Sequence, residues 1–157
     1  MAGLLHAIIL TVHILASAAW FGGMFYSFFV LHPRARAFFS SPRQVEEFVV
    51  FVAGGARWKV LFGAAVIAVT GLMLMPGHDH APALWWTCLS AKVMLFLCAL
   101  AVFAYTSWKA WPARLFAAPE EIPRFQRQFR WIALALMGLV TLCFFLGVLS
   151  RFGSMQP

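Results

Sequence analysis

Four long apolar blocks, separated by short segments that hold nearly all of the charge, make up this sequence. The blocks cover approximately residues 4–32, 58–75, 84–108 and 131–149. Each is close to the roughly 20 apolar residues that an α-helix needs to cross the hydrocarbon core of a bilayer. The pattern therefore predicts an all-α polytopic membrane protein: a four-transmembrane-helix bundle in a single membrane domain, residues 1–157.

The low proportion of charged residues argues against a soluble domain. Charged residues make up 11% of the chain and hydrophobic residues 63%, whereas a soluble domain of this size carries roughly 25% charged residues. The net charge is +7, which in a soluble protein would suggest nucleic acid as a partner. Here the basic residues gather in two connecting segments, so we expect them to face anionic lipid, with the bilayer and no nucleic acid as partner.

The connecting segments also predict the orientation. Ten of the twelve Lys and Arg residues lie in or beside segments 33–57 and 109–130, and the tail before the first block has none. Cytoplasmic segments of membrane proteins are enriched in Lys and Arg. We therefore expect 33–57 and 109–130 to be cytoplasmic loops of a bacterial inner-membrane protein, with both termini in the periplasm.

Local signals predict where helices begin and end. Pro33 and the arginines after it are expected to end the first span. Ser41-Pro42 is typical of a helix start, with a capping side chain followed by proline at the first position. That helix is either interfacial or an extension of the second span, interrupted at Gly54-Gly55. A further helix is expected to begin at 119–123 and to run into the fourth span. We find no convincing internal repeat.

Ionisable residues inside a membrane are costly and are therefore the best candidates for function. All five acidic residues lie outside the blocks, and away from span ends only His13 and Lys92 lie inside them. His13 is about nine residues, and Lys92 about eight, from the predicted periplasmic surface. At 1.5 Å per residue both lie roughly 12 to 14 Å deep. We therefore expect them to occupy the same layer of the outer half of the bilayer.

Lys92 has no intramembrane acid to neutralise it. Three outcomes are open: the amine loses its proton, the side chain extends to the outer interface, or it pairs with an anion that the protein does not supply. The third outcome suggests a ligand with a carboxylate, and a porphyrin propionate fits. Lys92 is accordingly a candidate cofactor-binding and catalytic, proton-handling residue.

His13 lies on a helix face that also carries small residues. His6, His13 and Trp20 are spaced by seven and so share one face, together with Ser17 and Gly23. Small residues allow another helix or a flat ligand to come close. A neutral histidine on such a face suits an axial ligand of haem b, with these five residues lining the cofactor. The other interpretation is a histidine that forms a hydrogen bond across the bundle.

A second candidate metal site lies at the outer end of the second span. Met73 and Met75 end that span, and His78 and His80 follow in the loop. Thioether and imidazole groups are typical ligands for Cu(I). In this alternative, the four residues collect copper and His6 and His13 pass it inward. An ordinary apolar helix end followed by a polar loop is the simpler interpretation.

The first span resembles that of a known family. The run from His13 to Tyr26, with its His, six residues and then Trp-Phe-Gly-Gly, resembles the opening helix of the CopD-like membrane proteins. With Ala for the first Gly, the same pattern opens the HemJ proteins. Thr70-Gly71, and Lys92 within Ser-Ala-Lys-Val-Met-Leu, resemble the Gly and Lys of the next two helices in those families.

The resemblance implies a function. HemJ proteins are membrane proteins of four or five helices that bind haem b and oxidise protoporphyrinogen IX, and their functional His and Lys correspond to His13 and Lys92. CopD-like proteins are associated with copper uptake or tolerance. Where HemJ proteins have Asn-Glu-x-Pro after an Arg, this chain has Trp131-Ile-Ala-Leu after Arg130. It therefore resembles the CopD-like proteins more closely.

Three hypotheses follow. The first is a haem b-binding membrane redox protein, a candidate oxidoreductase that exchanges electrons with quinone or a porphyrinogen. The second is a copper-handling membrane protein. The third is an accessory subunit of a larger membrane complex that needs no cofactor. A homo-oligomer and a larger complex are both open.

Overall fold

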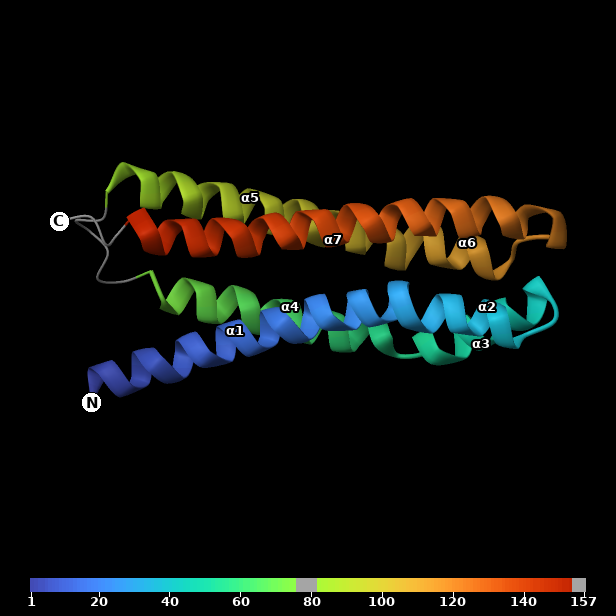
Figure 1. Ribbon diagram of the computed structural model, residues 1–157, viewed down its shortest axis with the longest axis horizontal. Helices are drawn as coiled ribbons and strands as arrows, with labels where there is room; N and C mark the ends of the chain where they lie inside the picture. The colour runs from blue at the N-terminus through green and yellow to red at the C-terminus, as the bar shows by residue number, and fades with distance from the viewer. Residues whose placement is uncertain (76–81, 154–157) are drawn as a thin grey trace.

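The computed structural model describes residues 1–75 and 82–153, and the described part is helical apart from short turns (Figure 1). The α-helices are α1 (Ala2–Tyr26), α2 (His32–Phe38), α3 (Pro42–Ala53), α4 (Ala56–Met73), α5 (Ala83–Tyr105), α6 (Trp111–Leu115) and α7 (Ile122–Gly153). Two π-helical turns, η1 (Ser27–Leu31) and η2 (Thr106–Ala110), and one 3₁₀ turn, η3 (Pro119–Glu121), connect them. The predicted all-α class is confirmed.

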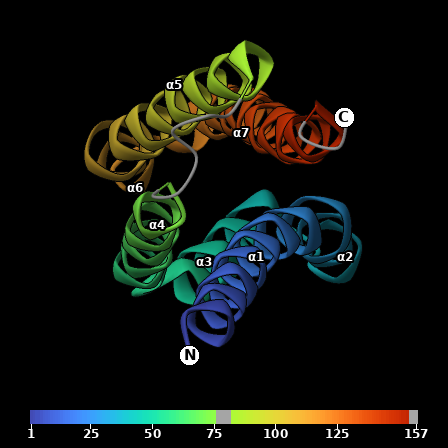
Figure 2. The ribbon, with the colours of Figure 1, turned by 90° about the vertical axis from the view of Figure 1, so that its left-hand side faces the viewer.

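The helices form two pairs: α1 packs along α4, and α5 packs along α7 (Figures 1 and 2). The starts of α1 and α5 and the ends of α4 and α7 lie at one end, on the left of Figure 1, which we call the terminal end. The opposite end, the loop end, holds α2, α3 and α6. Four helical stretches, Gly3–Phe38, Ala56–Met73, Ala83–Leu115 and Ile122–Ser150, are long and apolar enough to cross a membrane.

Large apolar side chains are exposed along the bundle, and the most deeply buried side chains between its helices are small. Phe62 and Phe145 are 73% and 63% exposed, which would be costly in water but not in lipid. The most buried side chains are small ones such as Ala64, Cys88 and Ala99. Small residues let helices approach closely where lipid removes the hydrophobic driving force. The surface is therefore that of a membrane-spanning bundle.

The helix that contains the first predicted span does not end at Pro33. The π-turn η1 precedes the proline, the His32 N–H donates to the Ser27 carbonyl, and α2 continues to Phe38. Proline cannot donate to the preceding turn and disturbs a regular α-helix at that point. A π-turn redistributes the hydrogen bonds around it, so the helix passes the proline. The helix therefore extends beyond the predicted 4–32 span.

A π-turn before a proline also occurs in the third span. The π-turn η2 precedes Pro112, and the Trp111 N–H donates to the Thr106 carbonyl. His13 precedes Pro33 by twenty residues, as Lys92 precedes Pro112. α1 and α5 thus share one local pattern, although the sequence showed no convincing repeat. The correspondence gives His13 and Lys92 equivalent positions along their helices.

The predicted helix starts are confirmed. The Ser41 side chain accepts a hydrogen bond from the Gln44 backbone N–H at 3.3 Å, and Pro42 is the first residue of α3. α3 and α4 are separate helices because Gly55 adopts a φ of 72°, a left-handed conformation that glycine allows. At the start of the last span, η3 leads directly into α7.

Candidate functional site

His13 lies at the contact between α1 and α4. Its Nδ1 is 2.9 Å from the Thr70 Oγ1. A methyl group at Gly71 would lie 3.2 Å from the His13 Cε1, closer than side-chain contacts usually are. The absence of a side chain at Gly71 therefore allows the imidazole to reach the hydroxyl of Thr70.

The hydrogen bonds of Thr70 assign the tautomer of His13. The Thr70 hydroxyl lies 2.6 Å from the Val66 carbonyl oxygen and 3.2 Å from that of Ile67. A hydroxyl has one hydrogen and a carbonyl oxygen only accepts, so Thr70 donates to Val66. Thr70 then accepts from His13, whose Nδ1 carries the proton. The Nε2 of His13 is left with a free lone pair.

Lys92 lies between α5 and α7. The Cys143 thiol donates to the Lys92 carbonyl, with 3.7 Å between sulfur and oxygen. The Nζ of Lys92 lies beside Gly147, which is one helical turn after Cys143 on α7. A methyl group at Gly147 would be 3.4 Å from this nitrogen. α7 runs toward the terminal end, so the Lys92 side chain extends in that direction. Among residues 1–75 and 82–153, no acceptor forms a hydrogen bond with the ammonium.

His13 and Lys92 lie close enough for their charges to interact. Their helices also meet at an aromatic contact: the rings of Trp20 and Phe96 are edge to face, with 5.9 Å between centroids. α1 and α5 run in the same direction (Figure 1). Both side chains are partly buried. We call His13, Thr70, Gly71 and Lys92 the central site.

The other residues predicted beside His13 contribute less. The Ser17 hydroxyl donates to the His13 carbonyl at 2.8 Å and is therefore tied to its own helix. A methyl group at Gly23 would meet nothing within 4 Å, so no neighbouring helix packs closely there. His6 lies on α1 nearer the terminal end and is exposed. The structure therefore does not bring His6 to the central site.

The predicted copper site is only partly described. Met73 is the last residue of α4 and is 52% exposed. His78 and His80 lie outside the described residues. Within the described ranges, no three His, Cys, Asp or Glu side chains come together as a metal site would require.

Sequence reasoning missed an ion-pair cluster at the loop end. Arg114 donates to both carboxylate oxygens of Glu46, at 2.7 and 2.8 Å, and the Gln126 amide donates to Glu46 at 2.9 Å. The side chains of Arg114 and Glu46 are only 6% and 14% exposed. Burial by itself would raise the pKa of Glu46, but the hydrogen bonds from Arg114 and Gln126 outweigh it and lower that pKa below its ordinary value.

Arg57 has a role that follows from the π-turn η2. Pro112 has no N–H, so the carbonyl of Ser107 lacks its partner in the helix. The Arg57 guanidinium donates a hydrogen bond to this carbonyl and lies over the ring of Trp108 at 5.0 Å. Sequence reasoning assigned Arg57 only to the positive charge of the loop.

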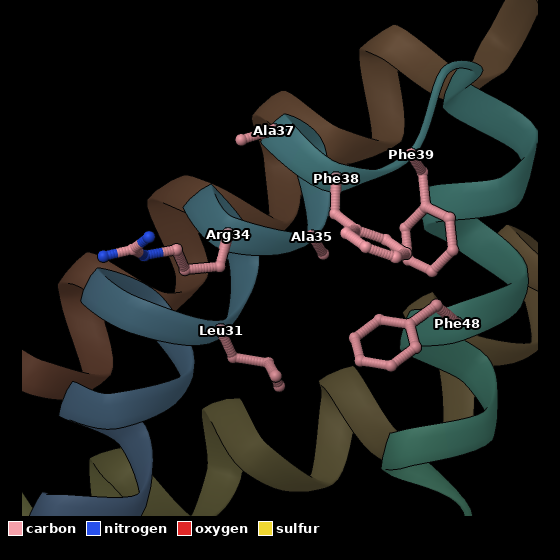
Figure 3. Close-up of a pocket in the computed structure, with 7 residues that line it drawn as sticks. All are labelled: Leu31, Arg34, Ala35, Ala37, Phe38, Phe39 and Phe48. Carbon is pink, nitrogen blue, oxygen red and sulfur yellow. The ribbon is translucent and has the colours of Figure 1, made fainter.

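The larger of the two recesses found at the loop end is unrelated to the central site. It has a volume of about 450 Å³ and lies between η1, α2 and α3. Figure 3 shows Phe38, Phe39 and Phe48 gathered around it, with the Arg34 guanidinium pointing away from the rings. Apart from Arg34, its lining is apolar, and it lies at the opposite end of the bundle from His6.

Comparisons with family models, curated proteins and solved structures found no match for this chain. The chemistry of the central site therefore rests on its own geometry. It presents an imidazole with a free Nε2 lone pair, held by Thr70, and an ammonium without an acidic partner among the described residues. The first group can bind a metal or accept a proton, and the second can neutralise an anion.

Proposed function

We propose that the protein binds haem b at the central site and acts as a membrane redox protein, with the Nε2 of His13 as axial ligand. The hydrogen bond from Nδ1–H to Thr70 carries the proposal. A metal-binding histidine usually donates its second ring N–H to a fixed acceptor, which sets the tautomer and the orientation of the ring. Thr70 is such an acceptor.

Lys92 supports the same proposal. A charge at this position needs an anion, because an unpaired ammonium within a bilayer is costly. The residues described around Lys92 provide no carboxylate, whereas a haem carries two propionates. Lys92 is therefore the residue to neutralise a propionate, and its amine can also hold a proton near His13.

The ligand set suits a haem with one protein ligand. His6 and His13 are on the same helix, seven residues apart, so they cannot bind opposite faces of one macrocycle. Haem bound to one neutral histidine is a common arrangement and supplies one-electron chemistry. The resemblance of the first span to CopD-like and HemJ proteins suggests quinone or a porphyrinogen as the electron partner. The charge distribution supports a site that opens to the periplasm of a bacterial inner membrane.

An absorption spectrum of the purified protein tests the proposal. We expect a Soret band and an α band on reduction, and we expect His13→Ala to lower the haem content at least tenfold. His6→Ala is the matched control, on the same helix but exposed, and should keep the spectrum of the unmodified protein. An unchanged spectrum in His13→Ala would overturn the ligand assignment. A colourless protein that binds Cu(I) would favour copper handling instead, and a colourless one that does not would favour an accessory subunit.

A further inference from the structure

A small recess at the loop end is lined by three arginines. It lies between α2 and α7, has a volume of about 210 Å³, and is lined by Arg36, Pro123, Gln126, Arg127 and Arg130. We call it the arginine recess. Its lining contains no carboxylate, so three cations surround one cavity. Like charges that line one cavity repel each other, and an anion bound between them offsets this repulsion.

Glu46, which forms a hydrogen bond with the lining residue Gln126, does not neutralise the recess. Glu46 reaches Gln126, but Arg114 and Gln126 already occupy its two oxygens. Among the described residues, Arg36 donates only to the neutral amide oxygen of Gln126, at 3.4 Å.

The remaining two arginines of the recess are also uncompensated. Within residues 1–75 and 82–153, Arg127 and Arg130 form neither an ion pair nor a hydrogen bond through their side chains. All three guanidinium groups of the recess therefore remain available to an anion from outside the chain.

The position of the recess along the bundle indicates the source of that anion. Arg130 immediately precedes Trp131, which is 67% exposed and begins the long apolar stretch of α7. An exposed tryptophan at this position marks the boundary between lipid and water. The arginines thus lie at the level of the lipid headgroups, on the side that the positive-inside rule assigns to the cytoplasm, where anionic lipids are abundant.

We propose that the arginine recess binds the phosphate group of an anionic phospholipid. Guanidinium groups match phosphate oxygens with paired hydrogen bonds, which favours arginine over lysine at such sites. Arg36 belongs to the α1–α4 side of the molecule, whereas Arg127 and Arg130 belong to α7. A bound phosphate therefore links the two helix pairs at the loop end.

Native mass spectrometry of the detergent-solubilised protein tests this site. The probes are phosphatidylglycerol and phosphatidylcholine with identical acyl chains, and soluble glycerol phosphate in a separate titration. We expect phosphatidylglycerol to bind on the order of tenfold more tightly than phosphatidylcholine. Equal binding of the two lipids would overturn the proposal. Glycerol phosphate that binds as tightly as phosphatidylglycerol would overturn the lipid as the ligand.

Matched variants separate the recess from general surface charge. Arg127→Gln with Arg130→Gln should weaken phosphatidylglycerol binding on the order of tenfold. Arg34→Gln with Arg124→Gln removes the same charge from the same end, at positions that do not line the arginine recess, and should leave binding within about twofold. Equal losses in both double variants would overturn the proposal.

A further double variant tests the site if Arg127→Gln with Arg130→Gln does not fold. Arg127→Lys with Arg130→Lys keeps the charge and removes the paired donors, and we expect it to lose binding while remaining folded. Full binding by this variant would overturn the assignment of the arginines as paired donors to the phosphate.

Discussion

Thr70 determines which nitrogen of His13 is available. Its hydroxyl donates to the carbonyl of Val66, so the oxygen can only accept from the imidazole. The sequence placed Thr70 only in the motif that resembles the CopD-like and HemJ proteins, and it predicted no hydrogen-bond partner for the hydroxyl. A threonine in a transmembrane helix commonly bonds to its own backbone, and no local pattern shows that the same oxygen also meets a histidine 57 residues earlier.

Replacing Thr70 with Val keeps the shape of the side chain and removes its oxygen. We expect Thr70→Val to weaken haem binding about tenfold to a hundredfold, since the His13 ring loses the hydrogen bond from its Nδ1–H. The free energy of unfolding should also fall by about 1 kcal/mol because the Nδ1–H is left without a partner. Haem titration and thermal unfolding in detergent measure the two effects. Thr70→Ser keeps the hydroxyl and should restore both, and a Val variant that binds haem normally would contradict the assigned tautomer.

At the scale of the elements, the contact between α1 and α4 depends on Gly71. The two helices approach closely enough for the His13 ring to occupy the place of a side chain at this position. Gly63, two turns earlier on α4, has open space around it instead. The two glycines therefore allow a matched comparison on one helix.

We expect Gly71→Ala to destabilise the protein by about 1–3 kcal/mol, because the added methyl group displaces the imidazole. The haem spectrum should change as well. Gly63→Ala should change neither by a measurable amount. Thermal unfolding in detergent and the absorption spectrum provide the measurements. Equal behaviour of the two variants would show that His13 does not pack against α4.

The prolines show where local sequence signals mislead at this scale. Pro33 was expected to end the first span, yet η1 lets the helix continue to Phe38. At the other proline, Pro112 in the third span, Arg57 supplies the hydrogen bond that the proline cannot give to Ser107. A proline signals a missing donor, but whether the helix stops depends on whether another group satisfies the carbonyl. For Ser107 that group lies 50 residues away in the chain.

For the molecule as a whole, the pair of Glu46 and Arg114 joins α3 to the second half of the chain. Removing one partner of a buried pair leaves the other charge uncompensated. Glu46→Gln should therefore lower the free energy of unfolding by about 3 kcal/mol at pH 7. Glu47→Gln is the control, because the side chains of Glu47 and its partner Arg43 are 65% and 81% exposed; we expect a change of less than about 0.5 kcal/mol.

The same pair predicts a dependence of stability on pH. The pKa of Glu46 is lower in the folded protein than its ordinary value of 4.5. The contribution of ionised Glu46 to the free energy of unfolding is therefore fully present above about pH 4.5 and is lost as the pH falls through the folded-state pKa. Thermal unfolding between pH 7 and pH 3 should show a smaller loss of stability in Glu46→Gln than in the unmodified protein. Parallel curves for the two proteins would contradict this role.

The orientation of the whole bundle is a separate prediction. We expect alkaline phosphatase fused at the C-terminus to be active and green fluorescent protein fused there to be dark, because the distribution of Lys and Arg predicts that both ends face the periplasm. Fusions that end after residue 117, in the second predicted cytoplasmic loop, should behave in the opposite way. The reversed pattern would place the loop end outside and the central site near the cytoplasm.

The long apolar blocks were enough to predict the helical class and the four spans, because crossing lipid requires about 20 apolar residues in any fold. The cost of charge in lipid was likewise enough to select His13 and Lys92. The partners of these residues, the ion pair of Glu46 and Arg114, and the arginine recess became visible only in the packed bundle. Each joins positions 50 or more residues apart. Such pairs depend on how the helices rotate and cross, and the spacing of residues along one helix carries no information about its neighbour.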